Sequence, residues 1–326
     1  MNPDAKIKLS LVIPVYNEES VLPLLMTRLR GVLEELADIA TGEVIFVNDG
    51  SADSSLELLK KQMHEDPRFV VVNLSRNFGH TEAISAGLSV ASGDVVVVMD
   101  ADLQDPPELI PEMLKAYKQG FQVVLAERKS RQEKGTRRLA FDLFYRVFDF
   151  LADFPMTEKA GVFSLMDRTV VDHLNRLPEH NRFLPGLRNW VGFRKTSVLY
   201  DRSDRVAGKP KQTLKRLFQY GMNAVFSFSY KPLRLSFYLG LIVSFLFFMY
   251  ALVLIINRIF NIDFVKGFTT PTVTIMFLGG VQLIAIGILG EYLARIYDEV
   301  KRRPTFIISD VWSSSEKTVK AKAARD

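Results

Sequence analysis

The sequence of 326 residues contains no cysteine, which excludes disulfide bonds, thiolate zinc sites and thiol redox chemistry. Its four histidines are scattered and lack the spacing of a metal-binding motif. The N-terminal Met1-Asn2-Pro3-Asp4 has no apolar run, so we expect no cleaved signal peptide. The formal net charge is +5, but the basic residues gather beside apolar segments, so we expect no nucleic-acid partner.

Charged residues are also absent from two long stretches near the C-terminus, 235–257 and 267–290. Each is long enough to cross a hydrocarbon core of roughly 30 Å. The loop between them carries only Arg258, Asp263 and Lys266 as charged residues, whereas both outer flanks are rich in Lys and Arg. By the positive-inside rule, this pattern predicts a transmembrane hairpin with both termini in the cytoplasm.

Strand and helix patterns alternate over about the first 130 residues. Apolar strands are expected at 9–15, 44–47, 69–74, 95–98 and 122–126, and helices at 19–36, 52–63 and 81–91. Alternation with short connections predicts parallel βαβ units, and therefore an α/β fold with a mostly parallel sheet.

The valine run at 95–98 leads directly into Asp100-Ala101-Asp102-Leu103-Gln104. Uninterrupted valine predicts a strand buried on both faces, and ligands of such sheets bind at the carboxyl ends of the strands. A desolvated carboxylate there is costly unless a cation offsets it. The motif therefore favours a Mg²⁺ or Mn²⁺ site at Asp100 and Asp102, completed by Gln104 and a substrate phosphate. The alternative is a solvated acidic turn, because Asp-x-Asp alone is common.

Three further polar loops follow predicted strands, at 14–19, 48–51 and 75–80. Because the carboxyl ends of parallel strands meet at one edge of a sheet, we expect all four loops to form a single site.

Two amphipathic segments and a polar tail complete the chain. A helix at 139–154 has one polar stripe on an otherwise apolar surface, which predicts an interfacial membrane helix or a subunit contact, with a buried helix as the alternative. The basic segment 205–234 has no acidic residue, and its part 214–228 is expected to lie along the membrane surface and to attract anionic lipid. The polar tail after Asp310 is expected to be disordered.

In combination these motifs resemble the family-two, GT-A-fold polyprenyl-phosphate glycosyltransferases, the group that includes dolichyl-phosphate mannose synthase and bacterial bactoprenol glucosyltransferases. The resemblance is carried in order by 12–19, 47–51, 75–80, 100–104 and 289–304. It implies a GT-A (Rossmann-like) domain at 1–204, a basic juxtamembrane segment at 205–234, a hairpin at 235–303 and a tail at 304–326.

The resemblance also implies roles for individual residues. The donor pocket would involve Pro14, Tyr16, Glu18, Asp49, Ser51, Asn77, Gly79 and Ala101, with Asp49 bonded to the base. Asp100, Asp102 and Gln104 would hold the metal and the diphosphate, and Arg128 and Arg131 would grip phosphates. Arg205 and Lys211 match the basic pair of the family's Arg-x-x-Gly-x-Ser-Lys-Tyr stretch, although Pro210 and Gln212 depart from it.

Relatives usually carry an Asp just before the glycine that corresponds to Gly161, where this chain has Ala160. Glu158 or Asp153 is available as a substitute. Alternatively no general base is needed, because a lipid monophosphate with a second pKa of about 6 is largely a dianion at neutral pH.

The implied reaction is metal-dependent, inverting transfer of a sugar from a nucleotide sugar to a polyprenyl phosphate, with glucose from UDP-glucose favoured. GDP-mannose and UDP-linked amino or deoxy sugars stay open. A processive polysaccharide synthase is disfavoured because the Gln-x-x-Arg-Trp motif is missing. A lipid flippase is disfavoured because the two predicted spans carry little polar surface. A non-catalytic scaffold that binds nucleotide sugar is the alternative of another class. The family further implies a multi-pass protein of the cell (inner) membrane with a cytoplasmic catalytic domain. It also implies a homo-oligomer, for which a tetramer is one arrangement.

Overall fold

The structure is a computed structural model that describes residues 6–128, 160–180, 182–201, 229–259, 269–314 and 316–319. Within these ranges the chain forms two compact units. One is an α/β unit made of the described residues up to 201 and those from 303 onward, and the other is a helical hairpin between 229 and 302. The expected helix at 139–154 and residues 202–228 lie outside the described residues.

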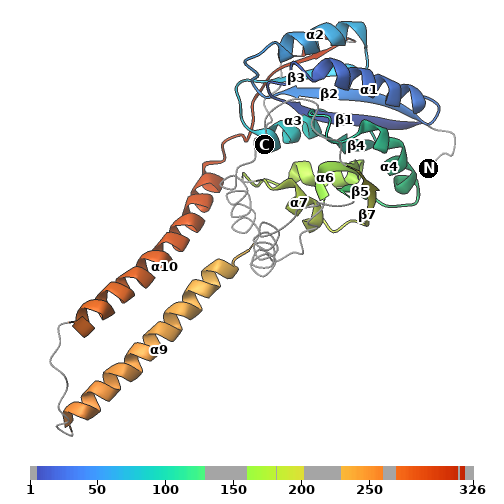
Figure 1. Ribbon diagram of the computed structural model, residues 1–326. Helices are drawn as coiled ribbons and strands as arrows, with labels where there is room; N and C mark the ends of the chain where they lie inside the picture. The colour runs from blue at the N-terminus through green and yellow to red at the C-terminus, as the bar shows by residue number, and fades with distance from the viewer. Residues whose placement is uncertain are drawn as a thin grey trace. The chain divides into compact units, whose positions relative to one another are not determined.

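The described strands of the α/β unit form one nine-stranded sheet in the order β7-β5-β6-β4-β1-β2-β3-β8-β9 (Figure 1). Their bounds are β1 Ile7–Val15, β2 Ala40–Asn48, β3 Phe69–Leu74, β4 Val95–Val98, β5 Val123–Arg128, β6 Ala160–Asp167, β7 Lys195–Tyr200, β8 Ile308–Ser313 and β9 Glu316–Val319. The group β4-β1-β2-β3 is parallel, as predicted from the alternating pattern. The whole sheet is mixed, because β6 and β8 run antiparallel to their neighbours.

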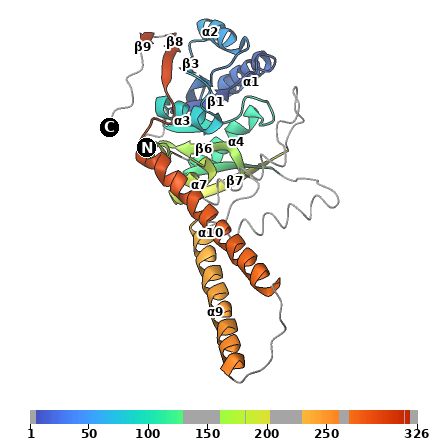
Figure 2. The same ribbon diagram turned by 90° about the vertical axis from the view of Figure 1, so that its left-hand side faces the viewer.

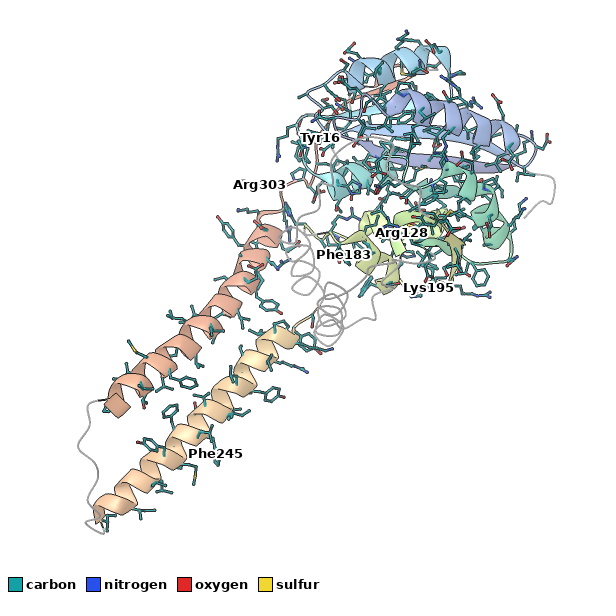
Figure 3. All side chains as sticks on the ribbon, in the orientation of Figure 1. Tyr16, Arg128, Phe183, Lys195, Phe245 and Arg303 are labelled. Carbon is teal, nitrogen blue, oxygen red and sulfur yellow. The ribbon has the colours of Figure 1, made fainter. Side chains whose placement is uncertain are left out.

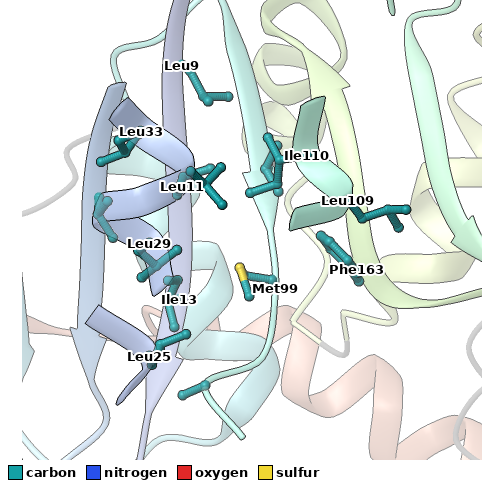
Figure 4. Close-up of a cluster of buried hydrophobic side chains, with 14 of the residues drawn as sticks. Leu9, Leu11, Ile13, Leu25, Leu29, Leu33, Met99, Leu109, Ile110 and Phe163 are labelled. Atoms are coloured by element: carbon teal, nitrogen blue, oxygen red, sulfur yellow. The ribbon is translucent and has the colours of Figure 1, made fainter. Parts of the chain in front are cut away.

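Helices cover both faces of this sheet. Their bounds are α1 Leu22–Glu35, α2 Ser55–Glu65, α3 His80–Val90, the short 3₁₀ helix η1 Pro107–Leu109, α4 Ile110–Lys118, α6 Arg168–Arg176 and α7 Leu184–Trp190. Alternate residues of β1 face opposite sides, as the two-residue period of a strand requires. Leu9, Leu11 and Ile13 pack against Leu25, Leu29 and Leu33 of α1, as Figure 4 shows.

The opposite face of β1 packs against α3 at unusually close range. A Cβ added at Gly87 of α3 would lie 2.3 Å from a methyl group of Val12, so only glycine permits this approach. Leu11 and Leu29 are fully buried in the α1 layer, and truncation of either side chain to alanine would cost about 2–5 kcal/mol. The core therefore fixes the position of β1, whose carboxyl end begins the first polar loop.

Strand register brings the polar loops to one level. Val98 of β4 pairs with Val12 of β1, Asn48 of β2 pairs with Val15 of β1, and Asn73 of β3 pairs with Asn48. All four valines of β4 are buried, as predicted for a strand covered on both faces. The loops after β1, β2, β3 and β4 consequently leave the sheet at the same edge.

The prediction that the tail after Asp310 is disordered is wrong for its described residues, 311–314 and 316–319. Residues Ile308–Ser313 form β8, which lies beside β3 (Figure 2) and pairs with it antiparallel, Val72 opposite Val311 and Val71 opposite Trp312. Trp312 packs against the hydrophobic core, and the amine of Lys60 lies 4.4 Å from the centre of its ring. Without β8, this edge of β3 would be exposed, and exposed strand edges readily pair with another strand. The edge of β3 therefore orders the residues of the tail.

The second unit consists of α9 Lys231–Ile259 and α10 Thr269–Lys301. Both contain stretches long and apolar enough to cross a membrane, Lys231–Tyr250 and Val273–Lys301. Their large apolar side chains are exposed, such as Phe245, which is 61% exposed (Figure 3). At one end the Tyr292 hydroxyl donates to the backbone oxygen of Ser229 at 2.6 Å and ties α10 to the residues before α9. Apolar exposure on this scale is typical of a surface that meets lipid.

Candidate active site

A cleft of about 360 Å³ lies at the carboxyl ends of β1, β2, β3 and β4, where the polar loops meet. Most of the residues expected in the site line it, namely Pro14, Tyr16, Glu18, Asp49, Asn77, Gly79, Asp100, Ala101 and Asp102. Val15, His80 and Ala83 line it as well. Val15 and His80 belong to two of the expected loops but had been given no role of their own, and Ala83 lies outside those loops. The prediction that the four loops share one site is therefore confirmed by the geometry of the sheet edge.

Asn17 shapes the loop that carries Tyr16 and Glu18. Its φ of 54° lies in the left-handed region, which asparagine tolerates better than most residues. Its side-chain oxygen accepts from the backbone amide of Ala52 at 2.8 Å, and its backbone amide donates to the hydroxyl of Ser51 at 3.0 Å. Ser51, expected in the donor pocket, instead supports the pocket by holding Asn17. Tyr16 keeps 44% of its surface exposed and lines the cleft.

Asp49 is buried and clamps the loop after β3. One carboxylate oxygen accepts from the amide of Phe78 at 2.7 Å and the other from that of Gly79 at 3.0 Å. Burial raises the pKa of Asp49, and the two backbone N–H groups oppose that rise. Each oxygen keeps a further lone pair for a ligand donor, so the expected contact with a base is compatible with the clamp.

Asp100 and Asp102 follow β4 and both line the cleft. A carboxylate oxygen of Asp100 lies 2.8 Å from the Nε2 atom of His80, in the first turn of α3. Partial burial lowers the pKa of His80, but the hydrogen bond and charge of Asp100 outweigh it, so the pKa stands above its ordinary value. His80 belongs to the loop motif at 75–80. Its position directly after Gly79 was the feature of the sequence that could have placed it in the site.

Leu103 turns the chain between Asp102 and Gln104. Its φ of 59° is uncommon for a residue with a side chain, and its complete burial holds the turn in place. The backbone amide of Gln104 donates to Asp102 at 3.2 Å. Gln104 itself does not line the cleft, so of the expected metal set only Asp100 and Asp102 face it.

A divalent ion fits these residues only with help from the substrate. Among the described residues no group of three or more histidines and acids is arranged to hold a metal. Mg²⁺, however, commonly binds to one or two carboxylates together with substrate phosphates and water. Two carboxylates facing a cleft of this size match the protein part of that donor set.

A buried polar cluster stands behind the acidic turn. Asp105 is 3% exposed and accepts from the Tyr200 hydroxyl at 2.5 Å. That hydroxyl accepts in turn from Nε of Arg128 at 3.2 Å, and the Arg128 guanidinium is 3.9 Å from Asp105. Burial, followed by the charge of Asp100, raises the pKa of Asp105 to about 6. Arg128, expected to grip phosphates, is thus anchored at the end of β5 and does not line the cleft.

The remaining expected site residues lie outside the described part of the chain. These are Arg131, Asp153, Glu158, Arg205 and Lys211. Their roles stay predictions.

The mixed sheet, with its acidic cleft at the ends of the parallel strands, is the GT-A architecture of glycosyltransferases. The chain belongs to glycosyl transferase family 2, which matches residues 10–174. Residues 231–296 match the GtrB C-terminal hairpin, which covers α9 and most of α10. The family inferred from the motifs is therefore confirmed, and the chain is a glycosyltransferase with a membrane-associated hairpin.

Relatives cover almost the full length of the chain. It is 45% identical to an uncharacterised glycosyltransferase of Synechocystis sp., over 94% of this chain and 96% of the relative. It is 41% identical to a bactoprenol glucosyl transferase of Shigella phage SfII, over 92% of this chain and 97% of the relative. It is 38% identical to a prophage bactoprenol glucosyl transferase homolog of Escherichia coli, over 93% and 99%. The solved glucosyl-3-phosphoglycerate synthase of Mycobacterium tuberculosis is more distant, with a TM-score of 0.46, 17% identity and coverage of 68% and 78%.

Proposed function

We propose that this glycosyltransferase transfers glucose from UDP-glucose to a polyprenyl phosphate, in a reaction that needs Mg²⁺ or Mn²⁺ and inverts the anomeric carbon. The observation that carries the proposal is the convergence of Asp49, Asp100 and Asp102 on one cleft. The choice of acceptor and sugar is supported by relatives named bactoprenol glucosyl transferases, which match more than nine-tenths of the chain.

The cleft suits a nucleotide diphosphate. The exposed ring of Tyr16 offers a stacking face for a base, and Asp49 offers carboxylate lone pairs to a base N–H. Asp100 and Asp102 would hold the divalent ion, which when bound neutralises the charge that develops on the departing diphosphate. GDP-mannose and UDP-linked amino or deoxy sugars meet the same groups and are the alternative donors.

The chain's own residues position the reactants. His80 and Asp49 fix the acidic side chain and the α3 loop before substrate arrives, so little reorganisation is needed at the moment of reaction. An oxygen of the lipid phosphate attacks the anomeric carbon while the bond to the nucleotide diphosphate breaks, and its electrons leave on the diphosphate. Because the phosphate is mostly a dianion at neutral pH, with a second pKa of about 6, the attack requires no general base.

The hairpin supplies the membrane side of the proposal. Helices α9 and α10 would span the cell membrane, with the catalytic unit and both termini on the cytoplasmic side, because basic residues flank the spans on that side. The basic segment 205–234, including Arg205 and Lys211, would attract the anionic acceptor. Assembly as a homo-oligomer, for which a tetramer is the family's precedent, also belongs to this proposal.

The test is label transfer by the purified full-length protein in vesicles that contain undecaprenyl phosphate. We expect Mn²⁺ or Mg²⁺ and labelled UDP-glucose to give solvent-extractable labelled lipid, with less label from a panel of other nucleotide sugars. Asp102→Asn should lower the rate by about a thousandfold, since it removes charge stabilisation at the reacting centre. Glu108→Gln, which removes a nearby surface carboxylate paired with Arg28, is the control and should keep the rate.

Each other outcome selects an alternative. Label in a product that stays with the aqueous or insoluble fraction indicates a processive synthase, and binding of nucleotide sugar without lipid label indicates a scaffold. An Asp102→Asn variant with the wild-type rate would contradict the proposed role of the acidic turn.

A further inference from the structure

A chain of side-chain hydrogen bonds crosses β2, β3 and β8 next to the cleft. The amide nitrogen of Asn48 donates to the side-chain oxygen of Asn73 at 2.7 Å, and the amide nitrogen of Asn73 donates to the hydroxyl of Ser309 at 2.9 Å. The Ser309 hydroxyl donates in turn to the backbone oxygen of Asn73 at 3.0 Å. Ser309 thereby uses its hydroxyl both as acceptor and as donor.

The chain of hydrogen bonds continues from Asn48 to the loop after β1, which lines the cleft. The side-chain oxygen of Asn48, a residue only 1% exposed, accepts from the amide of Ser51 at 3.3 Å. Ser51 holds Asn17 through its hydroxyl at 3.0 Å, and Asn17 stands between Tyr16 and Glu18. A residue of the tail is thus linked to the loop that carries Tyr16 by hydrogen bonds in which side chains of Asn73, Asn48 and Ser51 take part, and the last two bonds are donated by backbone amides.

A second contact joins the tail to the other side of the cleft. The amide of Ser75 donates to the backbone oxygen of Ile307 at 3.0 Å. Ser75 begins the loop that presents Asn77 and Gly79 to the cleft. Ile307 therefore contacts the start of the loop after β3 directly. Ser309 reaches the loop after β1 only indirectly, through Asn73, Asn48 and Ser51.

Strand pairing by itself does not require a hydroxyl at position 309. The backbone hydrogen bonds between β3 and β8 do not involve the side chain at position 309. The hydrogen bond from the Asn73 side chain, in contrast, needs the Ser309 hydroxyl as its acceptor. An asparagine amide presents an acceptor on one side and donors on the other. By accepting from the nitrogen of Asn73, Ser309 selects the orientation in which the oxygen of Asn73 faces Asn48. Without that acceptor, the Asn73 amide can turn its nitrogen toward the donor of Asn48 and break the chain.

We propose that Ser309 is a positioning residue for the sugar donor, and that the segment after the second apolar helix is part of the nucleotide-sugar site. The inference rests on the proposed function for the identity of the donor. It assigns the tail a role in donor binding and none in acceptor binding.

The experiment is a kinetic comparison in the full-length protein of Ser309→Ala, Ser309→Thr and Ser313→Ala. Ser313 lies in the same strand, and no side-chain hydrogen bond of it is found among the described residues. Ser309→Ala should raise KM for UDP-glucose about fivefold and leave KM for undecaprenyl phosphate unchanged, because one network of hydrogen bonds is lost. Ser309→Thr restores a hydroxyl and should stay near wild type, as should Ser313→Ala.

A double variant tests whether the effect runs through Asn73. Asn73→Ala should raise the donor KM, and adding Ser309→Ala should raise it no further, because both changes break the same chain. Equal donor KM values for Ser309→Ala and Ser313→Ala would overturn the inference, and so would a parallel rise of both KM values.

Binding of UDP with Mn²⁺, measured by calorimetry below the melting temperature, separates this inference from the proposed function. If the wild type labels no lipid but Ser309→Ala weakens UDP binding, the proposed function fails and the positioning role stands. If the wild type labels lipid and all serine variants bind UDP equally, only the positioning role fails.

Discussion

The Nε2 atom of His80 lies 2.8 Å from a carboxylate oxygen of Asp100, across the cleft between the start of α3 and the end of β4. The contact orients the first acid of the Asp100-Ala101-Asp102 turn without any ligand. It also joins the loop after β3 to the loop after β4. Orientation of a group in advance of binding is a general source of catalytic power.

Loss of this contact should affect metal use more than the maximal rate. We predict that His80→Ala lowers the transfer rate about tenfold at limiting Mn²⁺ and much less at saturating Mn²⁺, because Asp100 loses a contact that orients it toward the proposed ion. The measurement is initial rate against Mn²⁺ concentration. An equal loss at every Mn²⁺ concentration would show that His80 acts elsewhere.

Gly50 allows the loops after β2 and β3 to approach each other. Its φ is +66°, and an added Cβ would lie 2.6 Å from the amide nitrogen of Asn77. Gly50→Ala should therefore displace Asn77 and raise KM for the donor about tenfold. Gly31→Ala is the control, since no atom lies within 4 Å of the added Cβ and the residue is within α1. We expect it to raise the melting temperature, because alanine favours the helix by about 1 kcal/mol; a Gly50→Ala variant with normal donor KM would contradict the account.

Tyr200 provides the hydroxyl between Asp105 and Arg128. Tyr200→Phe should cost about 1–3 kcal/mol of stability, because it leaves buried Asp105 without this donor. It should also lower the rate, since Arg128 loses the partner that holds it behind the acidic turn. Tyr117→Phe also removes a hydroxyl that donates to a carboxylate, that of Asp167 at 2.8 Å, but outside the cleft.

Thermal melts and initial rates of the two tyrosine variants separate stability from activity. Both should melt earlier than wild type, and only Tyr200→Phe should lose activity at a temperature where both are folded. Equal activity of the two variants would mean that the cluster behind the turn serves stability alone.

Asp66 should make stability depend on pH at the acid end. It accepts from Nε of Arg68 at 2.9 Å and from Nε of Arg30 at 3.3 Å, and chiefly the hydrogen bonds from Arg68 lower its pKa from 3.8 to about 2. Because the folded state favours the charged form, its contribution is complete above about pH 4 and fades as the pH falls toward 2. The contribution is about 1–2 kcal/mol, since the partly exposed arginines are screened by solvent.

Asp66→Asn should accordingly lower the melting temperature at pH 7 and lower it less at pH 3. Glu57→Gln is the control, because its exposed carboxylate is 3.6 Å from Lys60 and should contribute little at either pH. A loss from Asp66→Asn that is the same at both pH values would show that the pair does not depend on the charge of Asp66.

The sequence predicted those parts of the fold that local pattern determines. The strands β1, β3 and β4 were located because each is an apolar run ended by a polar loop, and the site residues directly after them followed. The sequence reasoning missed contacts between distant positions. His80 meets Asp100 across 20 residues, Tyr200 meets Asp105 across 95, and Ser309 meets Asn73 across 236.

One residue received no role from the sequence, and one local prediction failed for a physical reason. Asp105, which precedes Pro106 and Pro107, was assigned no role, but it is buried and accepts a hydrogen bond from Tyr200. The tail was predicted to be disordered because of its polar composition, yet Val311 and Trp312 pair with β3 at the edge of the parallel group β4-β1-β2-β3. Composition describes a segment in isolation, and the sheet edge that orders it is encoded far upstream.

The place of β8 in the chain has a consequence for biosynthesis. A ribosome makes the strands β1 to β4 first and β8 only after both apolar helices have been translated. A nascent chain that stops within the second helix has every motif of the cleft but lacks the strand that closes the edge of β3. The sheet therefore reaches its finished form only when translation has passed both helices of the hairpin.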